Sequence, residues 1–288
     1  METQDILKKV RQIEIKTKGL TQHLFSGAYH STFKGRGMSF SEVREYQFGD
    51  DIRHIDWNVT ARSGQTQIKV FEEERELTLM LLVDISRSTN FGSLDQTKSQ
   101  WMTELCAVLA FSATQNHDKV GMILFSDKIH LYIPPKKGKL HILRMIRELL
   151  VQRSDAGKTR YDLPLQYLNR VQTKKTICFL ISDFNHPVNE PSLKIVSRRH
   201  DVIGLQMLDP LEKNWVNVGL IQLQDSENGK EILFDSSDKT WVKQISENQK
   251  NHNLKLKQVF NRANADLLHL DLNESYIKNL LNFFKKRH

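Results

Sequence analysis

The sequence predicts an α/β protein with a mostly parallel sheet, one antiparallel edge strand and helices on both faces. From Leu77 to the C-terminus, short apolar segments alternate with longer segments of helical periodicity. The apolar segments are hydrophobic at nearly every position, which is typical of strands buried on both faces of a sheet. One pair of these segments is separated by a turn too short for a crossover, so one strand must run antiparallel.

The first 76 residues have a different pattern. Residues 4–18 place apolar side chains at helical spacing. Further along, aromatic residues are scattered among charged ones, and the turn-like segments Phe48–Asp51 and Arg62–Gln65 separate short alternating stretches. We therefore expect an N-terminal helix and a small β-hairpin lobe over residues 1–76, followed by the α/β domain over residues 77–288.

The predicted strands of the α/β domain are Leu77–Ile85, Val120–Phe125, Ile129–Ile133, Thr176–Ser182, Val202–Met207 and Leu267–Leu272. The predicted helices are Leu94–Asn116, Leu140–Val151, Leu163–Val171, Pro191–His200, Lys239–Ala265 and Glu274–Lys286. The second and third strands are joined only by the turn SDK, which makes them the antiparallel pair. A hairpin insertion is expected near residues 219–234, turning at SENGK.

Composition limits the class of protein. The longest apolar runs, such as LTLMLLV, are far shorter than the about 18 to 20 residues of a membrane span, and the N-terminus has no signal-peptide apolar centre. We therefore expect a cytoplasmic protein with no transmembrane segment. The net charge of +8 is not concentrated in a dense basic block, so no dedicated nucleic-acid binding is expected. Cys106 and Cys178 fall in apolar patterns and are predicted to be buried free thiols.

Oxygen-bearing side chains follow two of the predicted buried strands. Asp84 ends the first strand and begins a D-x-S-x-S sequence with Ser86 and Ser88. Asp183 ends the strand TICFLIS in the same manner, and Thr159 precedes a helix after a loop. Ligands of open α/β sheets bind at the carboxyl ends of the strands. The five side chains are therefore expected to converge at one edge of the sheet.

These five side chains offer only oxygen donors, which favours a hard cation, Mg²⁺ or Mn²⁺, over Zn²⁺. The three hydroxyls carry no charge, and the two carboxylates at most balance a dication. If Asp183 acts through water, the ion keeps an electrophilic position that a partner's carboxylate or a phosphate oxygen could fill. A buried cationic side chain in the same pocket would contradict this prediction.

The order of these motifs resembles a known family. DISRS, then Thr159, then ISDF are similar to the metal-ion-dependent adhesion site of von Willebrand factor A domains, and the elements from Leu77 onward match that Rossmann-like fold. Upstream, the segment GRGMSFSEVREYQFGDDIRHIDWNVTARSGQTQIKVFEEERE resembles the signature of the bacterial domain-of-unknown-function family fifty-eight. Together the resemblances cover nearly the whole chain from Gly19 onward.

The resemblance implies a non-enzymatic, metal-dependent protein-interaction module. The family's metal positions carry over as Asp84, Ser86, Ser88, Thr159 and Asp183. Relatives are often encoded beside MoxR-type AAA+ ATPases, which implies such an ATPase or its client as the partner that donates an Asp or Glu, with a role in assembly or maturation of other proteins. Arg87, Glu72 and Glu74 are expected to contact the partner.

Other interpretations of the site residues stay open. D-x-S-x-S alone would more often be a helix N-cap with a turn aspartate, and Asp183 alone would usually be a turn residue. A Mg²⁺-dependent hydrolase acting on phosphate esters is the alternative function, for which Asp183 is the only obvious base. The GKT of Gly157–Thr159 lacks the Gly that a P-loop needs five positions earlier, because Gln152 is found there.

The acids of the N-terminal lobe could suggest a second metal site. Asp50, Asp51 and the HID sequence ending at Asp56 lie close together in the chain. Arg44 and Arg53 are near them in sequence, however, and salt bridges within a hairpin would account for these acids.

Overall fold

The computed structural model describes residues 6, 8–14, 16, 38–73, 77–93, 95–152, 158–213, 217–224 and 231–287. The chain divides into two compact units, a lobe formed by Phe33–Leu77 and a larger sheet unit formed by the remaining residues. The helical residues 8–14 belong to the sheet unit, where Lys16 forms a 2.7 Å ion pair with Glu104. The N-terminal helix therefore groups with the sheet and not with the lobe.

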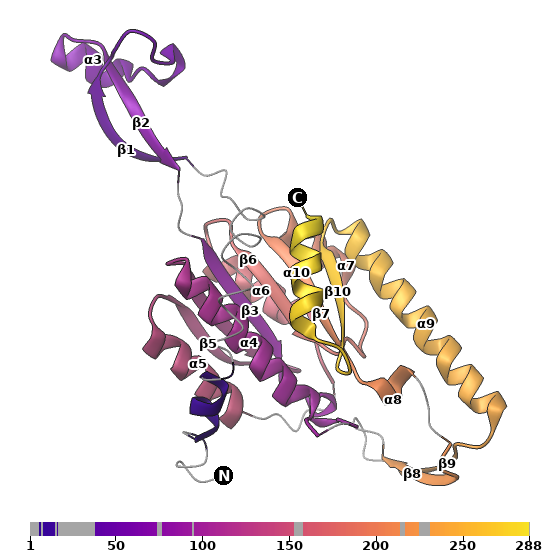
Figure 1. Cartoon of the computed structure of the whole chain (residues 1–288). Coiled ribbons are helices and arrows are strands. Elements are labelled where there is room, and N and C mark those ends of the chain that lie inside the picture. Colours follow the sequence, from indigo (N-terminus) through magenta and orange to yellow (C-terminus); the bar gives the residue numbers. More distant parts are fainter. Residues whose placement is uncertain are drawn as a thin grey trace. The chain divides into compact units, whose positions relative to one another are not determined.

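The sheet unit is built on six strands in the order β10-β7-β6-β3-β4-β5 (Figure 1). The strands are β3 (Thr78–Asp84), β4 (Lys119–Phe125), β5 (Ile129–Lys136), β6 (Ile177–Ser182), β7 (Asp201–Leu208) and β10 (Asp266–Asp271). Five strands are parallel, and β5 pairs antiparallel with β4 at one edge. The predicted fold class is confirmed.

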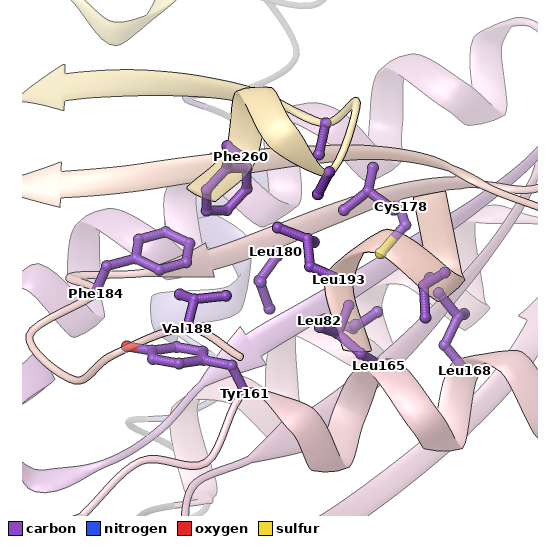
Figure 2. Close-up of a cluster of buried hydrophobic side chains, with 14 of the residues drawn as sticks. Leu82, Tyr161, Leu165, Leu168, Cys178, Leu180, Phe184, Val188, Leu193 and Phe260 are labelled. Carbon is purple, nitrogen blue, oxygen red and sulfur yellow. The ribbon is translucent and has the colours of Figure 1, made fainter. Parts of the chain in front are cut away.

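Helices cover both faces of this sheet. They are α4 (Lys98–Gln115), α5 (Lys139–Val151), α6 (Asp162–Val171), α7 (Glu190–Ser197), α8 (Pro210–Lys213), α9 (Lys239–Arg262) and α10 (Tyr276–Lys286). Successive strand residues point to opposite faces, so β6 directs Phe179 to Phe284 of α10, while Cys178 and Leu180 pack on the other face. Figure 2 shows this second core, where Leu165 of α6 and Phe260 of α9 approach the strands.

The strand order changes direction at β3. From β3 the chain moves outward to β4 and β5, and it then crosses to β6 on the other side of β3 and continues to β7 and β10. Ligands of open α/β sheets bind at such a switch point, at the carboxyl ends of the strands. The switch point lies between β3 and β6, the two strands that the predicted site residues follow.

A separate antiparallel pair lies where the hairpin insertion is expected. Strands β8 (Leu220–Gln224) and β9 (Glu231–Asp235) pair Leu220 with Asp235. Both cysteines, Cys106 and Cys178, are buried free thiols, as predicted.

The lobe consists of β1 (Met38–Glu45) paired antiparallel with β2 (Gln67–Glu73), a 3₁₀ turn η1 (Ile52–His54) and helix α3 (Trp57–Ser63). These elements agree with the small hairpin lobe that the alternating stretches predict. The register between the two strands shifts once, so the pair is irregular along its length.

The acids of the lobe are engaged in structural contacts. Asp50 forms an ion pair with Arg44 at 2.8 Å, and Asp51 forms one with Arg53 at 2.6 Å. Asp56 accepts hydrogen bonds from the first backbone N–H groups of α3 and so caps that helix. These contacts agree with the salt-bridge interpretation of the lobe acids.

Candidate metal centre

The centre begins at two neighbouring strand ends. Asp84 is the last residue of β3, and Asp183 immediately follows β6. The strands are parallel and pair Val83 with Ile181, so the two aspartates leave the sheet at the same edge. Asp84 is 1% exposed and Asp183 is 2% exposed. Two carboxylates are therefore buried side by side at the switch point of the sheet.

The loop after β3 folds around its own backbone. Asp84 Oδ1 accepts a hydrogen bond from Ser86 N at 2.8 Å, and Thr89 Oγ1 donates to Ser86 O at 2.7 Å. This turn brings Ser86 Oγ within 3.2 Å of Ser88 Oγ. Ser86 precedes the 3₁₀ turn η2 (Arg87–Asn90) without capping it through its side chain. Asp84 is therefore a turn aspartate, as one of the open interpretations predicts. That interpretation also predicts a helix N-cap, but the side chain of Ser86 makes no capping hydrogen bond.

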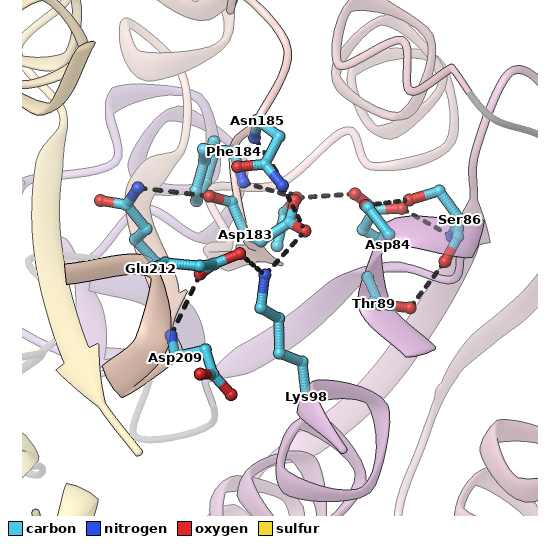
Figure 3. Close-up of polar contacts among 12 residues, drawn as sticks. Asp84, Ser86, Thr89, Lys98, Asp183, Phe184, Asn185, Asp209 and Glu212 are labelled. Atoms are coloured by element: carbon cyan, nitrogen blue, oxygen red, sulfur yellow. Dashed lines mark hydrogen bonds and ion pairs between the residues drawn. The ribbon is translucent and has the colours of Figure 1, made fainter. Parts of the chain in front are cut away.

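The second oxygen of Asp84 is bound from β6. Ser182 Oγ donates to Asp84 Oδ2 at 2.6 Å, and Figure 3 shows Asp84 and Ser86 at the end of β3. Ser182 Oγ also receives the N–H of Phe184 at 3.0 Å and lies 2.9 Å from the hydroxyl of Tyr161. Because the single hydrogen of Ser182 is given to Asp84, Tyr161 must be the donor in its own contact.

Asp183 is held by hydrogen bonds from Asn185 and by a cation, the ammonium group of Lys98. Its carboxylate accepts from the backbone N–H of Asn185 at 3.3 Å and from the side-chain amide of Asn185 at 2.9 Å. Lys98 Nζ lies 3.3 Å from Asp183 Oδ2 and 2.5 Å from Glu212 Oε1. Lys98 begins α4 and is 1% exposed. A fully buried ammonium group therefore bridges two acids (Figure 3).

Glu212 lies in α8, directly after the end of a third strand, β7. Asp209 follows β7 and accepts hydrogen bonds from Ser93 N at 2.8 Å and from Leu211 N at 2.9 Å. Glu212 Oε2 in turn accepts from Asp209 N at 3.1 Å. The polar network consequently extends over the ends of β3, β6 and β7.

Thr159 is the fifth predicted ligand. Its side chain is buried at 6% exposure, and its Oγ1 has no hydrogen-bond partner among the residues that the structure describes. The residues after it are bound to the same edge of the sheet, because Arg160 N donates to Ser126 O after β4 and the Tyr161 hydroxyl contacts Ser182 at the end of β6. The loop of Thr159 therefore reaches the strand ends that carry Asp84 and Asp183.

The two aspartates differ electrostatically. Burial raises the pKa of Asp84 to about 6, and the neighbouring charge of Asp183 adds to the rise, which its hydrogen bonds only partly oppose. Burial works against the charge of Lys98, but Asp183 and Glu212 outweigh it and raise the pKa of Lys98. Asp183 thus has a resident counter-ion, and Asp84 has none among the described residues.

The donor set fits a hard dication at the Asp84 side of the centre. No group of three or more His, Cys, Asp or Glu side chains in the described parts of the chain is arranged to hold a metal, so an ion here would depend on hydroxyl oxygens. The orphaned oxygen of Thr159 and the adjacent hydroxyls of Ser86 and Ser88 are such donors. Oxygen ligands of this kind suit Mg²⁺ or Mn²⁺.

Lys98 requires a correction to the sequence analysis, which places no Lys beside Asp183. It is a buried cationic side chain of the kind that would contradict the metal prediction if it filled the pocket. Its ion pairs are with Asp183 and Glu212, and none of its described hydrogen bonds involves Asp84 or the three hydroxyls. Lys98 therefore compensates part of the charge of Asp183, and it makes no described hydrogen bond to the hydroxyls of Ser86, Ser88 or Thr159.

The expected partner-binding residues are found in different places. Arg87 is exposed on η2, between the two serines of the centre. Glu72 lies on β2 of the lobe, where its side chain is not described, and Glu74 falls outside the described residues.

Several residues of the centre are missing from the sequence analysis. Ser182 and Asp209 could have been found, because they stand at the carboxyl ends of predicted strands as Asp84 does. Lys98 carries no such signal, since it is one of several charged residues in a helical segment and its partners are 85 and 114 residues away.

Comparison with known proteins identifies the family. The model of the family "Protein of unknown function DUF58" matches residues 42–255. An uncharacterized protein of Mycobacterium tuberculosis (strain ATCC 25618 / H37Rv) is 26% identical over 281 residues, which cover 96% of this chain and 88% of that protein.

Two solved structures are similar at lower identity. The conserved hypothetical protein BatB from Bacteroides thetaiotaomicron is 17% identical, with a TM-score of 0.47 over 73% of this chain and 98% of BatB. Proximal thread matrix protein 1 from the mussel byssus, described with a zinc-occupied MIDAS motif, is 15% identical, with a TM-score of 0.40 over 74% of this chain and 47% of that protein.

In the described part of the chain, no helix combines the length and apolar character needed to cross a membrane. The strand order of the sheet unit, with its single antiparallel edge strand, is that expected of a von Willebrand factor A-like fold. Since the family match spans well over half of the sequence, the chain belongs to the DUF58 family, as its upstream signature and strand-end motifs predict.

Proposed function

We propose that the sheet unit is a divalent-metal-dependent protein-interaction module. One observation carries the proposal: the buried Thr159 hydroxyl has no hydrogen-bond partner among the described residues, and its loop reaches the edge where Asp84 and Asp183 are buried. Buried polar atoms are normally hydrogen-bonded. A ligand bound at this edge would supply the partner that Thr159 lacks.

The residues of the centre suit Mg²⁺ or Mn²⁺ better than softer metals. Ser86, Ser88 and Thr159 would hold the ion with neutral oxygens, supported by Asp84 and Asp183. Both aspartates already accept hydrogen bonds from protein groups, which fixes their orientation before any ion arrives. When bound, the ion supplies an electrophilic position that a carboxylate can occupy.

The charge of the centre supports a cation near Asp84. Burial raises the pKa of this carboxyl to about 6, which means that the folded protein disfavours its ionised form. A dication beside Asp84 would favour the ionised form again. A bound divalent ion would therefore supply the positive charge that favours the ionised form of Asp84.

A partner protein would supply the remaining ligand. An acidic side chain, Asp or Glu, would bind the ion, and the exposed guanidinium of Arg87 next to the two serines would favour its approach. The family resemblance points to a MoxR-type AAA+ ATPase or its client as the source of that acid. Glu72 and Glu74 of the lobe segment would provide a further contact with the same partner.

Metal binding is tested by titrating the purified full chain with Mg²⁺ in a calorimeter and by thermal unfolding. The wild type is expected to bind one ion and to unfold at a higher temperature with Mg²⁺, because a ligand that binds only the folded state stabilises it. Asp84→Ala and Thr159→Ala are expected to lose both effects. Asp235→Ala, which removes an exposed acid at the end of β9, serves as the matched control. A wild type that responds no more than Asp84→Ala rejects the metal centre.

Partner binding is tested by affinity capture with wild type and Asp84→Ala, each with and without a chelator. A functional partner is expected only with the metal-loaded wild type. Direct mixing with a purified MoxR-type ATPase then tests the implied partner. Capture that is unchanged by the chelator and by Asp84→Ala would separate the interaction from the metal.

A phosphate-ester hydrolase receives less support. Its base would have to be Asp183, whose oxygens accept from Asn185 and pair with Lys98. A carboxylate engaged in this way is poorly placed to take a proton from water.

A further inference from the structure

Lys98 is an unusual residue for the interior of a protein. It is 1% exposed, and its ammonium group contacts Asp183 and Glu212 and lies 5.6 Å from the centre of the Phe91 ring. Lysines are almost never fully buried unless acids pair with them. The position of Lys98 at the first residue of α4 brings this charge to the strand ends rather than to solvent.

The surrounding acids outnumber Lys98. Asp183 and Glu212 both form ion pairs with the one ammonium group, and Asp84 is buried at the end of the adjacent strand. These three carboxylates and Lys98 carry a net charge of −2 when all are ionised. A divalent ion would balance this excess. Without Lys98 the excess would be three, and the same ion would meet a more negative centre.

We infer that Lys98 is a resident counter-cation of the centre, which shares Asp183 with the bound ion and thereby lowers the affinity for that ion. This inference rests on the proposed metal centre. Asp183 cannot direct its full charge to a metal while its Oδ2 lies 3.3 Å from an ammonium group. Repulsion between two cations near one carboxylate also weakens the binding of the second.

A purely structural role for Lys98 makes a different prediction. The residue links α4 to the end of β6 and to α8, so its loss would destabilise the fold in either case. Only a charge that acts on the ion changes the dissociation constant of the metal. Metal affinity, measured apart from stability, therefore separates the two roles.

The experiment measures Mn²⁺ binding to the full chain by calorimetry at constant ionic strength. Lys98→Met keeps the length of the side chain and removes its charge, and it is expected to bind Mn²⁺ about tenfold more tightly. Glu212→Gln removes a negative charge but keeps an oxygen for Lys98, and it is expected to bind Mn²⁺ severalfold more weakly. Lys243→Met, which removes an exposed charge on α9, is the matched control and should bind as the wild type does.

Lys98→Met and Glu212→Gln are expected to change the Mn²⁺ affinity in opposite directions. Glu212→Gln therefore keeps the inference testable if Lys98→Met does not fold. Glu212 is 24% exposed at its side chain and is the milder change. Equal Mn²⁺ affinity in wild type and Glu212→Gln, or equal or weaker binding by a folded Lys98→Met, overturns the role of Lys98. A wild type that binds no Mn²⁺ at all rejects the metal centre itself, which is a separate outcome.

Discussion

The ends of β3 and β6 each carry a buried aspartate, and the two aspartates have different partners. Asp84 and Asp183 are both buried, and both leave adjacent parallel strands at the switch point of the sheet. Asp84 is held by a hydroxyl and a backbone amide, whereas Asp183 is held by the side chain and backbone of Asn185 and by the ammonium group of Lys98.

The two aspartates show that a buried carboxylate can be oriented by hydrogen bonds without having its charge balanced. Hydrogen bonds orient Asp84, but no side chain in the described residues compensates its negative charge, and burial raises its pKa to about 6. Lys98 compensates Asp183 within the protein. The proposed ion would therefore compensate mainly Asp84, and the following variants test that asymmetry.

Ser182→Ala is expected to have the largest effect. Ser182 Oγ donates to Asp84 and accepts from Phe184 N and Tyr161, so its loss removes three buried hydrogen bonds. The free energy of unfolding is expected to fall by about 4 kcal/mol, since buried donors left without partners add their desolvation cost. Urea unfolding at neutral pH measures it. Ser112→Ala is the matched control, because the buried Ser112 hydroxyl has no hydrogen-bond partner in the described structure; an equal loss in both variants would contradict the prediction.

Asp84→Asn is expected to stabilise the metal-free protein at neutral pH. The unfolded chain has the ordinary Asp pKa of about 4, so it releases the proton at lower pH than the folded state does, and ionisation of Asp84 costs stability between about pH 4 and pH 6. Removing the charge should regain about 3 kcal/mol above pH 6. At every pH the variant should lose about 1 kcal/mol, because the Asn NH₂ group cannot accept one of the two hydrogen bonds that the Asp84 oxygens accept. Urea unfolding of both proteins across this pH range, with chelator present, gives the difference.

The same substitution should abolish Mg²⁺ binding while it stabilises the metal-free fold, which is an unusual combination. A difference between Asp84→Asn and wild type that stays constant from pH 4 to pH 7 would show that Asp84 does not titrate in this range.

Asp183→Asn is expected to have the opposite sign. Lys98 would lose one of its two acidic partners and keep Glu212, so the free energy of unfolding should fall by about 2 kcal/mol in the absence of metal. Chemical unfolding with chelator measures the change. Asp201→Asn breaks the more exposed ion pair with Arg287 and is the control, with an expected loss below about 1 kcal/mol. A stabilising Asp183→Asn would mean that the two aspartates are equivalent after all.

The fold was largely predictable because its strands are unambiguous. The predicted segment Val120–Phe125 differs from β4 (Lys119–Phe125) by one residue, since a strand buried on both faces is apolar throughout. The predicted start of α4 is wrong by four residues. The helix begins at Lys98 and not at Leu94, because Thr97 and Gln100 form a capping box that fixes its first turn.

The candidate centre was predictable only where chemistry coincides with strand ends. Asp84 and Asp183 stand out in the sequence because each is an acid at the end of an apolar segment. Lys98 does not, because its role depends on how α4 packs across the ends of strands far away in sequence. The sequence pattern therefore predicts the two carboxylates but not the cation that makes them unequal.

Tyr161→Phe is expected to have the smallest effect and to refine the description of Asp84. Its ring stacks on Phe184 at 5.2 Å and would remain, so only the hydroxyl that donates to Ser182 is lost. The free energy of unfolding should fall by about 1 kcal/mol. Tyr276→Phe is the control, because the buried hydroxyl of Tyr276 has no hydrogen-bond partner among described residues. If urea unfolding shows a loss only for Tyr161→Phe, then the chain from Tyr161 through Ser182 to Asp84 acts as a unit, and hydrogen bonding orients a carboxylate that has no counter-ion among the described residues.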